Sequence, residues 1–380
     1  MSPSSMASMA PSSAEPPALP APDLPAPPAP WLSPINLYAH TRSTDLSPTV
    51  AGALPRIYVP NRVSGTVSVI DPATLKVVGR FRVGFSPQHV VPSWDMKTLY
   101  VTNDGNDYPK RGSLTPIDAM TGRPGKPIKV DDPYNMYFMP DGSAAIVVAE
   151  SAARLDFRNP HSFALLYSID VPGCRGINHA DFSADGSYAI FTCEFGGSLA
   201  KIDLKARSVV GYLLLAAGGM PQDIRISPDG TTFYVADMQS DGVFTVDGAR
   251  FVTTGFLHTG IGTHGFVVSR DGTKLYISNR GTRRMQGGGH DGPGSISVLD
   301  FATNRLERTW LIPGGGSPDM GNVSADGTQL WYSGRFDNLA YMIDTTTGAV
   351  TRIRVGTEPH GLAVWPQPGR YSLGHTGNMR

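Results

Sequence analysis

Short runs of alternating apolar and polar residues recur along the chain from Pro55 onward, and each run is bounded by Gly, Pro, Asn or Asp. One pattern, an apolar residue, Tyr, a second apolar residue, a variable residue and then Asn or Asp, occurs at 57–61, 99–103, 233–237 and 275–279. Weaker copies lie at 146–150, 188–194 and 330–335, which gives seven in all. Runs of this length between turn signals predict β-strands.

Tight turns and two further strands accompany these copies. A short apolar run ending in Ser-x-Asp-Gly precedes several of them, at 183–186, 227–230, 269–272 and 324–327. Asp-Gly between two apolar runs is a strong hairpin signal. Further strands follow each copy, for example at 67–71 and 77–83. Four short strands in each period of about 40–50 residues are typical of a propeller blade. We predict an all-β, seven-bladed β-propeller.

The two ends of the repeat region complement each other. The region begins with the second strand of a blade at 56–61 and ends with a first strand at 361–365. Pairing of that C-terminal first strand with the N-terminal second to fourth strands would close the ring and remove its free edges. We expect one propeller over 34–380, with repeats at about 55–366. The Pro/Ala/Ser-rich segment 1–33 buries too little apolar surface to order, and we predict a disordered tail.

The segments at 99–103 and 67–71 resemble the YVTN repeat family, the YncE-like seven-bladed propellers, over roughly residues 55–366. Related propellers include binding proteins, lactonases, streptogramin lyases and metal-bearing redox domains, so the fold alone does not select a function. The resemblance implies that the first strand of each blade lines a central channel. It also implies a channel mouth, the face on which the loops before the first strands and after the second strands open.

Composition narrows the function classes. Lys and Arg number 32 and Asp and Glu number 32, so the net charge is zero, which argues against a nucleic-acid binder. No apolar stretch of about 18 residues is present, so no membrane-spanning helix is expected. The sequence shows no signal peptide. We therefore expect a cytoplasmic protein, with an exported or periplasmic location left open.

Polar residues cluster where the first strands begin. Counting back from the turn serine or its equivalent, the fifth residues are Gln88, Tyr134, Asn178, Gln222, His264, Asp319 and His360. The fourth residues include His89, Asn135, His179 and Asp223, and the second strands end with residues that include Glu150, Glu194 and Arg335. We expect these side chains to converge at the channel mouth, where the polar ones would bind a substrate.

Imidazoles and carboxylates converging on one axis suit a divalent metal ion such as Zn, Cu, Fe or Mn. The predicted metal ligands are His89, His179, His264, His360 and Asp319. Without a metal, the predicted catalytic residues His264, His360, His179 and Asp223 would act as general bases and acids. His258, which ends a fourth strand, is also expected to face the mouth. The alternative is that these groups bond neighbouring loop amides in a polar channel.

Two longer loops and two cysteines complete the candidate chemistry. The Gly-rich loop 280–294 is interpreted as a lid whose three arginines, Arg280, Arg283 and Arg284, bind an anion or carboxylate, opposite a smaller loop at 104–112. Cys174 and Cys193 flank one blade and either form a disulfide or act as soft ligands beside His179. The Asp after each third strand and His161 are assigned to turns. His40 and His375 lie outside the repeats and are assigned no role.

The resulting functional hypothesis is a small-molecule enzyme with a His/Asp site at the channel mouth. It would catalyse either hydrolysis, as in lactonases, or elimination, as in lyases. One alternative is a propeller that binds a ligand or a protein partner without turnover. A second alternative is a metal-dependent oxidoreductase. The ligand sets of the lactonase and lyase families do not map cleanly onto this sequence, so the resemblance does not decide among them.

Overall fold

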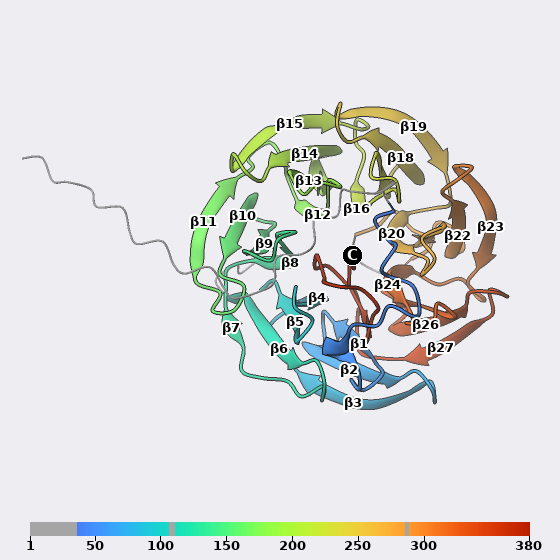
Figure 1. Ribbon diagram of the computed structural model, residues 1–380. Helices are drawn as coiled ribbons and strands as arrows, with labels where there is room; N and C mark the ends of the chain where they lie inside the picture. Colours follow the sequence, from blue (N-terminus) through green and yellow to red (C-terminus); the bar gives the residue numbers. More distant parts are fainter. Residues whose placement is uncertain (1–35, 106–110, 286–288) are drawn as a thin grey trace, which may run out of the picture.

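The computed structural model describes residues 36–105, 111–285 and 289–380. In these residues seven four-stranded antiparallel sheets stand around a central axis (Figure 1). This confirms the predicted all-β, seven-bladed propeller. The predicted disordered tail at 1–33 lies outside the described residues, as do parts of the two longer loops.

Each blade runs from an inner strand at the axis to an outer strand at the rim. The first three blades consist, from inside outward, of β28 (Ala363–Trp365), β1 (Arg56–Asn61), β2 (Thr66–Asp71) and β3 (Lys76–Arg82); β4 (Pro87–Pro92), β5 (Thr98–Asn103), β6 (Ser113–Asp118) and β7 (Ile128–Lys129); and β8 (Pro133–Phe138), β9 (Ala145–Ala149), β10 (Arg154–Arg158) and β11 (Leu165–Asp170).

The other four blades continue the same order around the ring. They consist of β12 (Ile177–Phe182), β13 (Tyr188–Cys193), β14 (Ser198–Asp203) and β15 (Ser208–Leu214); β16 (Pro221–Ile226), β17 (Thr232–Asp237), β18 (Gly242–Asp247) and β19 (Val252–His258); β20 (Thr263–Val268), β21 (Lys274–Asn279), β22 (Ser295–Asp300) and β23 (Arg305–Leu311); and β24 (Pro318–Val323), β25 (Gln329–Gly334), β26 (Leu339–Asp344) and β27 (Val350–Arg354).

Burial decreases from the axis to the rim, and this explains the sequence pattern of each strand. The inner strands β4, β8, β12, β16 and β24 are buried along their whole length. The outer strand β15 alternates exposed and half-buried residues. An outer strand has one face against the next blade and one in water, so its hydrophobic residues alternate. An inner strand has protein on both faces.

The ring closes as predicted, because β28 pairs with β1 in the register Arg56 to Trp365. The turns also follow the prediction. Asp185 accepts hydrogen bonds from the Ser183 hydroxyl and the Ser187 amide within its own turn. The third-strand aspartates likewise accept amides of their own turns, as Asp118 and Asp203 show. These carboxylates stabilise hairpins and lie away from the channel mouth.

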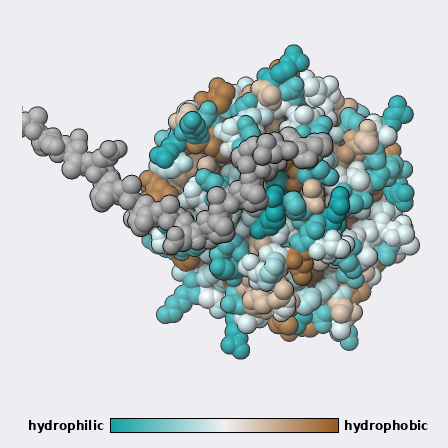
Figure 2. All heavy atoms as spheres, viewed as in Figure 1, coloured by the Kyte–Doolittle hydropathy of each residue, from teal (hydrophilic) through white to brown (hydrophobic). Residues whose placement is uncertain are grey.

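Both ends of the described chain cover the channel at the end opposite the mouth. Residues 366–380 follow β28 and run into the centre of the ring, where the C-terminus lies (Figure 1). Residues 36–55, with a 3-10 helix at Pro48–Val50, pack beside them. Tyr38 donates from its hydroxyl to the Ile226 carbonyl at 2.8 Å, and the Arg380 guanidinium lies over the Tyr38 ring. Hydrophilic and hydrophobic residues are intermixed on this face (Figure 2).

Candidate functional site

A β-bulge at the start of the inner strands aims two successive side chains at the channel. In β4, β8, β12, β16, β20 and β24, the pairing to the second strand shifts by one residue at the predicted site positions. In a regular strand, neighbouring side chains point to opposite faces. A bulge re-aims one of them. For this reason both Gln88 and His89, and likewise both Asn178 and His179, belong to the channel wall.

Nearest the mouth, one carboxylate joins two imidazoles. His360 Nδ1 lies 2.6 Å from Asp319 Oδ2 and 3.0 Å from Arg335 NH1. His264 Nδ1 lies 2.9 Å from Asp319 Oδ1. Tyr134 lies 3.1 Å from His360 Nε2 through its hydroxyl. We call Asp319, His264, His360 and Tyr134 the upper group. A proton on Nδ1 facing the carboxylate leaves the lone pair of each imidazole on Nε2.

The charges of the upper group follow from burial and from its neighbours. Burial, opposed by the nearby Asp319 carboxylate, lowers the pKa of His360 to about 3 and lowers that of His264. Burial acts to raise the pKa of Asp319, but the two imidazoles and Arg280 hold it well below its usual value. Arg335 adds a second cation, with NH1 3.6 Å from Asp319 Oδ2. The group therefore pairs an ionised carboxylate with neutral imidazoles at neutral pH.

The upper group borders a cavity of about 330 Å³ at the channel mouth. Its walls include His264, Tyr134 and Arg335 from the channel together with Glu150 and Glu194 from the ends of second strands. The volume falls in the range of small-molecule sites, about 300–1,000 Å³. The cavity is therefore a candidate binding site for a small molecule.

Amide and carboxyl groups pair along the cavity wall. Gln88 bonds Asp104, Asn178 donates to Glu194 at 2.5 Å, and Gln222 donates to Glu194 at 3.0 Å. Burial raises the pKa of Glu194, and the Gln222 bond and Arg335 oppose that rise. Burial, with Glu194 and Asp104 nearby, raises the pKa of Glu150 well above its usual value. The surroundings of Glu150 thus favour its protonated form.

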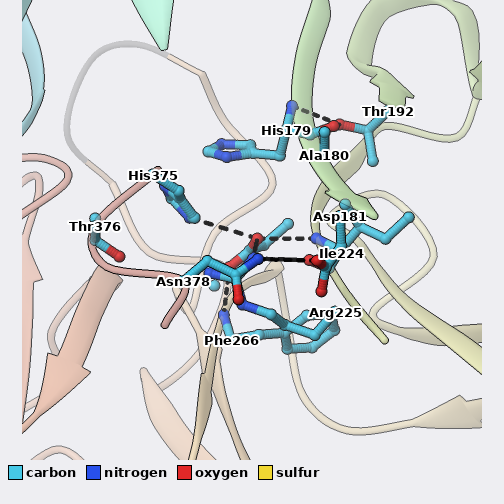
Figure 3. Close-up of polar contacts among 12 residues, drawn as sticks. His179, Ala180, Asp181, Thr192, Ile224, Arg225, Phe266, His375, Thr376 and Asn378 are labelled. Carbon is cyan, nitrogen blue, oxygen red and sulfur yellow. Dashed lines mark hydrogen bonds and ion pairs between the residues drawn. The ribbon is translucent and has the colours of Figure 1, made fainter. Parts of the chain in front are cut away.

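Deeper in the channel lies a second set of side chains, His89, Asn135, His179, Asp223 and His375, which we call the deep group. All five are buried. Figure 3 shows the ring of His179, from β12, facing that of His375, from the C-terminal segment. The ring centre of His89 lies 5.2 Å from the ring centre of His179 and 5.2 Å from that of His375. The ring centres of His179 and His375 are 4.7 Å apart.

Burial lowers the pKa of each imidazole in the deep group, and it is the largest effect for each of His89, His179 and His375. Asp223 is ionised. Although burial acts to raise its pKa, the Arg225 guanidinium, 2.8 Å away, and His375 hold it below its usual value. Asp223 also accepts the Phe266 amide of the next blade through Oδ2 at 2.9 Å. It therefore ties two blades together in addition to facing the channel.

His375, to which the sequence analysis assigned no role, lies buried in the channel. The C-terminal segment turns back into the channel: the His375 amide donates to the Met136 carbonyl at 2.9 Å, and Phe138 donates to the Leu373 carbonyl. The Asn322 amide holds Thr376 through its carbonyl. Because the segment lies outside the repeat, counting by blade could not place it. The only signal in the sequence was the pair of glycines that flank His375 and Thr376, because glycine lets the backbone turn sharply.

His258 also differs from its prediction, because it does not reach the channel. It ends the outer strand β19, is exposed, and packs its ring against Phe256 at 4.8 Å between centres. The register count placed it on the correct face of the disc but ignored its distance from the axis. Outer strands end at the rim, so a residue at such an end cannot join the channel group.

Two of the three predicted lid arginines lie on the rim. Arg283 forms an ion pair with Asp241, and Arg284 lies 3.8 Å from Asp291. Neither is among the described residues that line the mouth cavity, whereas their neighbour Met285 is. The third, Arg280, is buried, with its guanidinium over Phe336 and Nε 3.7 Å from Asp319. The remainder of the loop, at 286–288, lies outside the described residues, as does 106–110.

The disulfide and a second hollow lie outside the candidate site. Cys174 and Cys193 form a disulfide, so they are not soft ligands beside His179. A larger hollow of about 680 Å³ lies between blades 5 and 6, lined by residues such as Thr245, Phe256 and Phe301. Its carboxylate, Asp229, is bonded within its own turn. The hollow therefore lacks the convergent ionisable groups of the channel.

Arg225 is a further site residue that the sequence predictions did not assign. It lies two residues after Asp223 on the buried inner strand β16, and an ionisable residue in such a strand was a usable signal. Glu150 follows a second strand, and the same count that placed Glu194 at the channel mouth placed Glu150 there. In the described residues, no helix has both the length and the apolar character needed to cross a lipid bilayer.

Solved structures with this fold have diverse names. Hydrazine synthase of Kuenenia stuttgartiensis is 19% identical, with a TM-score of 0.58, and the match covers 82% of this chain and 98% of that one. A candidate 6-phosphogluconolactonase of Bacteroides uniformis is 17% identical, with a TM-score of 0.64 and coverages of 81% and 99%. Another from Bacteroides fragilis is 17% identical, with a TM-score of 0.65 and coverages of 84% and 100%. Likeness at this level of identity concerns the fold alone.

Sequence families give a more specific result. No curated protein matches the chain. Residues 32–368, however, match the family described as YNCE-like beta-propeller. The match spans all seven blades and the predicted repeat region, in agreement with the closed ring. This chain belongs to the YNCE-like beta-propeller family.

Proposed function

We propose that the protein is an enzyme that transforms a small polar molecule in the mouth cavity by general acid–base chemistry. The observation that carries the proposal is the Asp319 carboxylate shared by His264 and His360 beside that cavity. A carboxylate on Nδ1 fixes the tautomer of an imidazole and leaves Nε2 to take a proton. His264, which lines the cavity, is the proposed general base.

The proposed general acid is Glu150. It lines the same cavity as His264, and its environment favours the protonated form, while that of His264 favours the neutral imidazole. Titratable groups whose surroundings push their pKa values apart are the arrangement that acid–base catalysis needs. Glu194, bonded by Asn178 and Gln222, is held in place as part of the wall and is not proposed to donate the proton.

The proposed substrate class is a small molecule bearing hydroxyl groups. The wall pairs of amide and carboxyl groups, such as Gln88 with Asp104, present donors and acceptors side by side. Hydroxyl groups both donate and accept, so they can bind such pairs. Two structural neighbours carry the name of candidate 6-phosphogluconolactonases, and that name describes those proteins. For this chain it makes sugar lactones the first compounds to assay.

Two reactions use the same pair of residues. In hydrolysis, His264 takes a proton from water, the oxygen bonds to a lactone carbonyl carbon, the ring C–O bond breaks, and Glu150 protonates the leaving oxygen. In elimination, His264 takes a carbon-bound proton next to a carbonyl, a double bond forms, and Glu150 protonates the departing oxygen. The product of hydrolysis gains the mass of one water, and the product of elimination does not.

Binding without turnover is the second candidate function. The hydrogen bonds among the wall groups themselves favour it, because a rigid, prearranged polar wall also suits a binding protein. The divalent metal ion predicted on His89, His179, His264, His360 and Asp319 stays a prediction. The oxidoreductase alternative depends on a metal and stays a prediction as well.

The test is an activity screen of the full chain against sugar lactones and hydroxy-carbonyl compounds, followed by mass analysis of products. We expect His264→Gln and Glu150→Gln to lower kcat by about a hundredfold or more. His161→Gln, on an exposed turn, is the matched control and should leave kcat unchanged. With Glu150→Gln the alkaline decline of the pH profile should disappear. Turnover that survives in both variants, or ligand binding with no turnover of any compound bound, contradicts the proposal.

A further inference from the structure

The deep group carries an inference beyond the proposed reaction at the mouth and independent of it. Among its members, one ligand atom each from His179, Asp223 and His375 lies within 4.8 Å of the others. These residues come from β12, from β16 and from the C-terminal segment, and all three are buried. Three side chains that are distant in sequence, and of types that bind metal ions, thus converge at one buried point of the channel.

Several nitrogens at this point have no hydrogen-bond partner. His179 Nε2, His375 Nε2 and both ring nitrogens of His89 are buried without one. His375 Nδ1 lies 3.4 Å from Asn135, and His375 Nε2 lies 3.5 Å from Asp223, both beyond normal hydrogen-bond length. A buried polar atom left unpaired costs about 1–3 kcal/mol. His89 Nδ1 faces the backbone of Gly361, whereas the unpaired atoms of His179 and His375 lie near the Asp223 carboxylate, where one ion would reach all three side chains.

We propose that the C-terminal segment completes a transition-metal site in the channel, with His179, Asp223 and His375 as ligands. An ion held by two imidazoles at about 2.1 Å places the ring centres roughly 5 Å apart. The centres of His179 and His375 are 4.7 Å apart. The ligand atoms would need to close by about an ångström around the ion, a movement within reach of side-chain rotation.

The donor atoms indicate the class of ion. Two imidazoles and one carboxylate suit Zn²⁺, Cu²⁺ or Fe²⁺, while Mg²⁺ and Ca²⁺ prefer sites built from oxygen alone. The Asn135 side-chain amide lies 3.1 Å from His179 Nδ1, so Nε2 is the nitrogen left to face the ion. A metal bond at Nε2 places the ring proton on Nδ1, and the Asn135 amide would then accept that proton through its oxygen, as the outer partners of ligating histidines do. Asn135 is a positioning residue in this site.

The charge of the ion must be balanced within the protein. Asp223 is shared with Arg225, and their two charges cancel. Asp181 and Arg380, 2.8 Å apart beside them, cancel in the same way. An incoming cation would therefore be bonded by Asp223 Oδ1 in competition with Arg225. This competition favours ions that bind imidazole strongly; Cu²⁺ ranks highest among the divalent first-row ions, and Zn²⁺ also suits imidazole.

The C-terminal segment makes the site conditional on its own docking. His375 is brought to the axis by backbone bonds from its own amide to Met136 and from Phe138 to Leu373. Anchors farther along include Asn378 Nδ2, which donates to Asp181 at 2.9 Å (Figure 3). A metal bond to His375 would add to these anchors, so metal binding should stabilise the docked segment.

The test measures metal content of the full chain produced in medium supplemented with zinc or with copper, then washed free of loose ions. We expect about one ion per chain in the wild type, and a loss of about tenfold or more in His179→Gln and in His375→Gln. His161→Gln is the control and should keep the ion. Thermal melting with and without a chelator gives a second readout: the chelator should lower Tm of the wild type but not of the two variants.

The possible outcomes decide the proposal even if a variant folds poorly. Wild-type protein that holds no zinc or copper, with a Tm indifferent to the chelator, overturns it and points to bound water instead. Equal metal content in all four proteins also overturns it, since the ion then lies elsewhere. Retention of calcium or magnesium alone contradicts the ligand assignment. None of these results bears on His264 and Glu150, because metal content is read without any substrate.

Discussion

Acidification should unfold this propeller at a pH where most proteins are stable, because its channel buries five imidazoles. His89, His179, His264, His360 and His375 are at most 2% exposed. The pKa of each is lower in the folded protein than its usual value of 6.5. Below pH 6.5 the unfolded chain binds protons on these groups and the folded protein does not. Stability is therefore complete above this pH and is lost as pH falls towards the folded pKa values.

The magnitude follows from the number of groups. One pH unit below the unfolded pKa, each imidazole that remains neutral in the folded state lowers the free energy of unfolding by about 1.4 kcal/mol. For five imidazoles the upper limit is about 7 kcal/mol, which is comparable with the entire stability of a typical domain, about 5–15 kcal/mol. The pKa of Asp319, held low, does not offset this loss, because its carboxylate stays ionised over the same range.

The assay is urea unfolding with a chelator present, at about pH 8, 6.5 and 5.5, to bracket the unfolded pKa. On unfolding at acidic pH, the variant His89→Leu should take up about one proton fewer than the wild type, so its free energy of unfolding should depend less steeply on pH. It should cost little at alkaline pH, because both ring nitrogens of His89 lack partners. The exposed His161→Ala should leave the slope unchanged. A free energy of unfolding that is flat from pH 8 to 5.5 would refute the buried, neutral imidazole cluster.

Two further predictions concern packing and covalent structure. A Cβ added at Gly361 would lie 2.0 Å from His89 Nδ1, so Gly361→Ala should displace that ring and lower the free energy of unfolding by about 1–3 kcal/mol. Urea unfolding measures this effect, with Gly211→Ala as the control, because a Cβ there meets nothing within 4 Å. Removal of the disulfide by Cys193→Ser should lower the free energy of unfolding by about 3 kcal/mol, since the two cysteines are 19 residues apart. A Tm equal to that of the oxidised wild type would contradict this prediction.

Much of the architecture was accessible from local pattern. Alternating apolar residues, Asp-Gly turns and a repeating four-strand period predicted seven blades, and the incomplete blades at the two ends predicted the closure of β28 on β1. The turn aspartates were assigned correctly, because Asp beside a turn bonds its own backbone whatever the surroundings. The proximity of Cys174 to Cys193 also followed from their places in one blade, although the sequence left open whether they pair.

The candidate site was only partly accessible. Register counting placed Asp319, His264 and His360 together, and these three do meet. It also placed two successive residues of each strand on one face, which a regular strand forbids, and the β-bulges that permit it left no mark a single sequence could show. Radial position was lost in the same count, which is why His258 was expected at the mouth and lies on the rim.

By itself, then, the sequence determined the repeating unit, the number of blades and the residue types facing the axis, because strands and turns depend on neighbours within a few positions. The tertiary structure alone decided which of those residues meet. His375 reaches the deep group because the segment after the last strand finds backbone partners inside the channel, at Met136 and Phe138. Arg280 meets the buried Asp319 because two neighbouring blades pack side by side at the axis. Contacts between segments hundreds of residues apart depend on how the ring closes, and no local pattern records that.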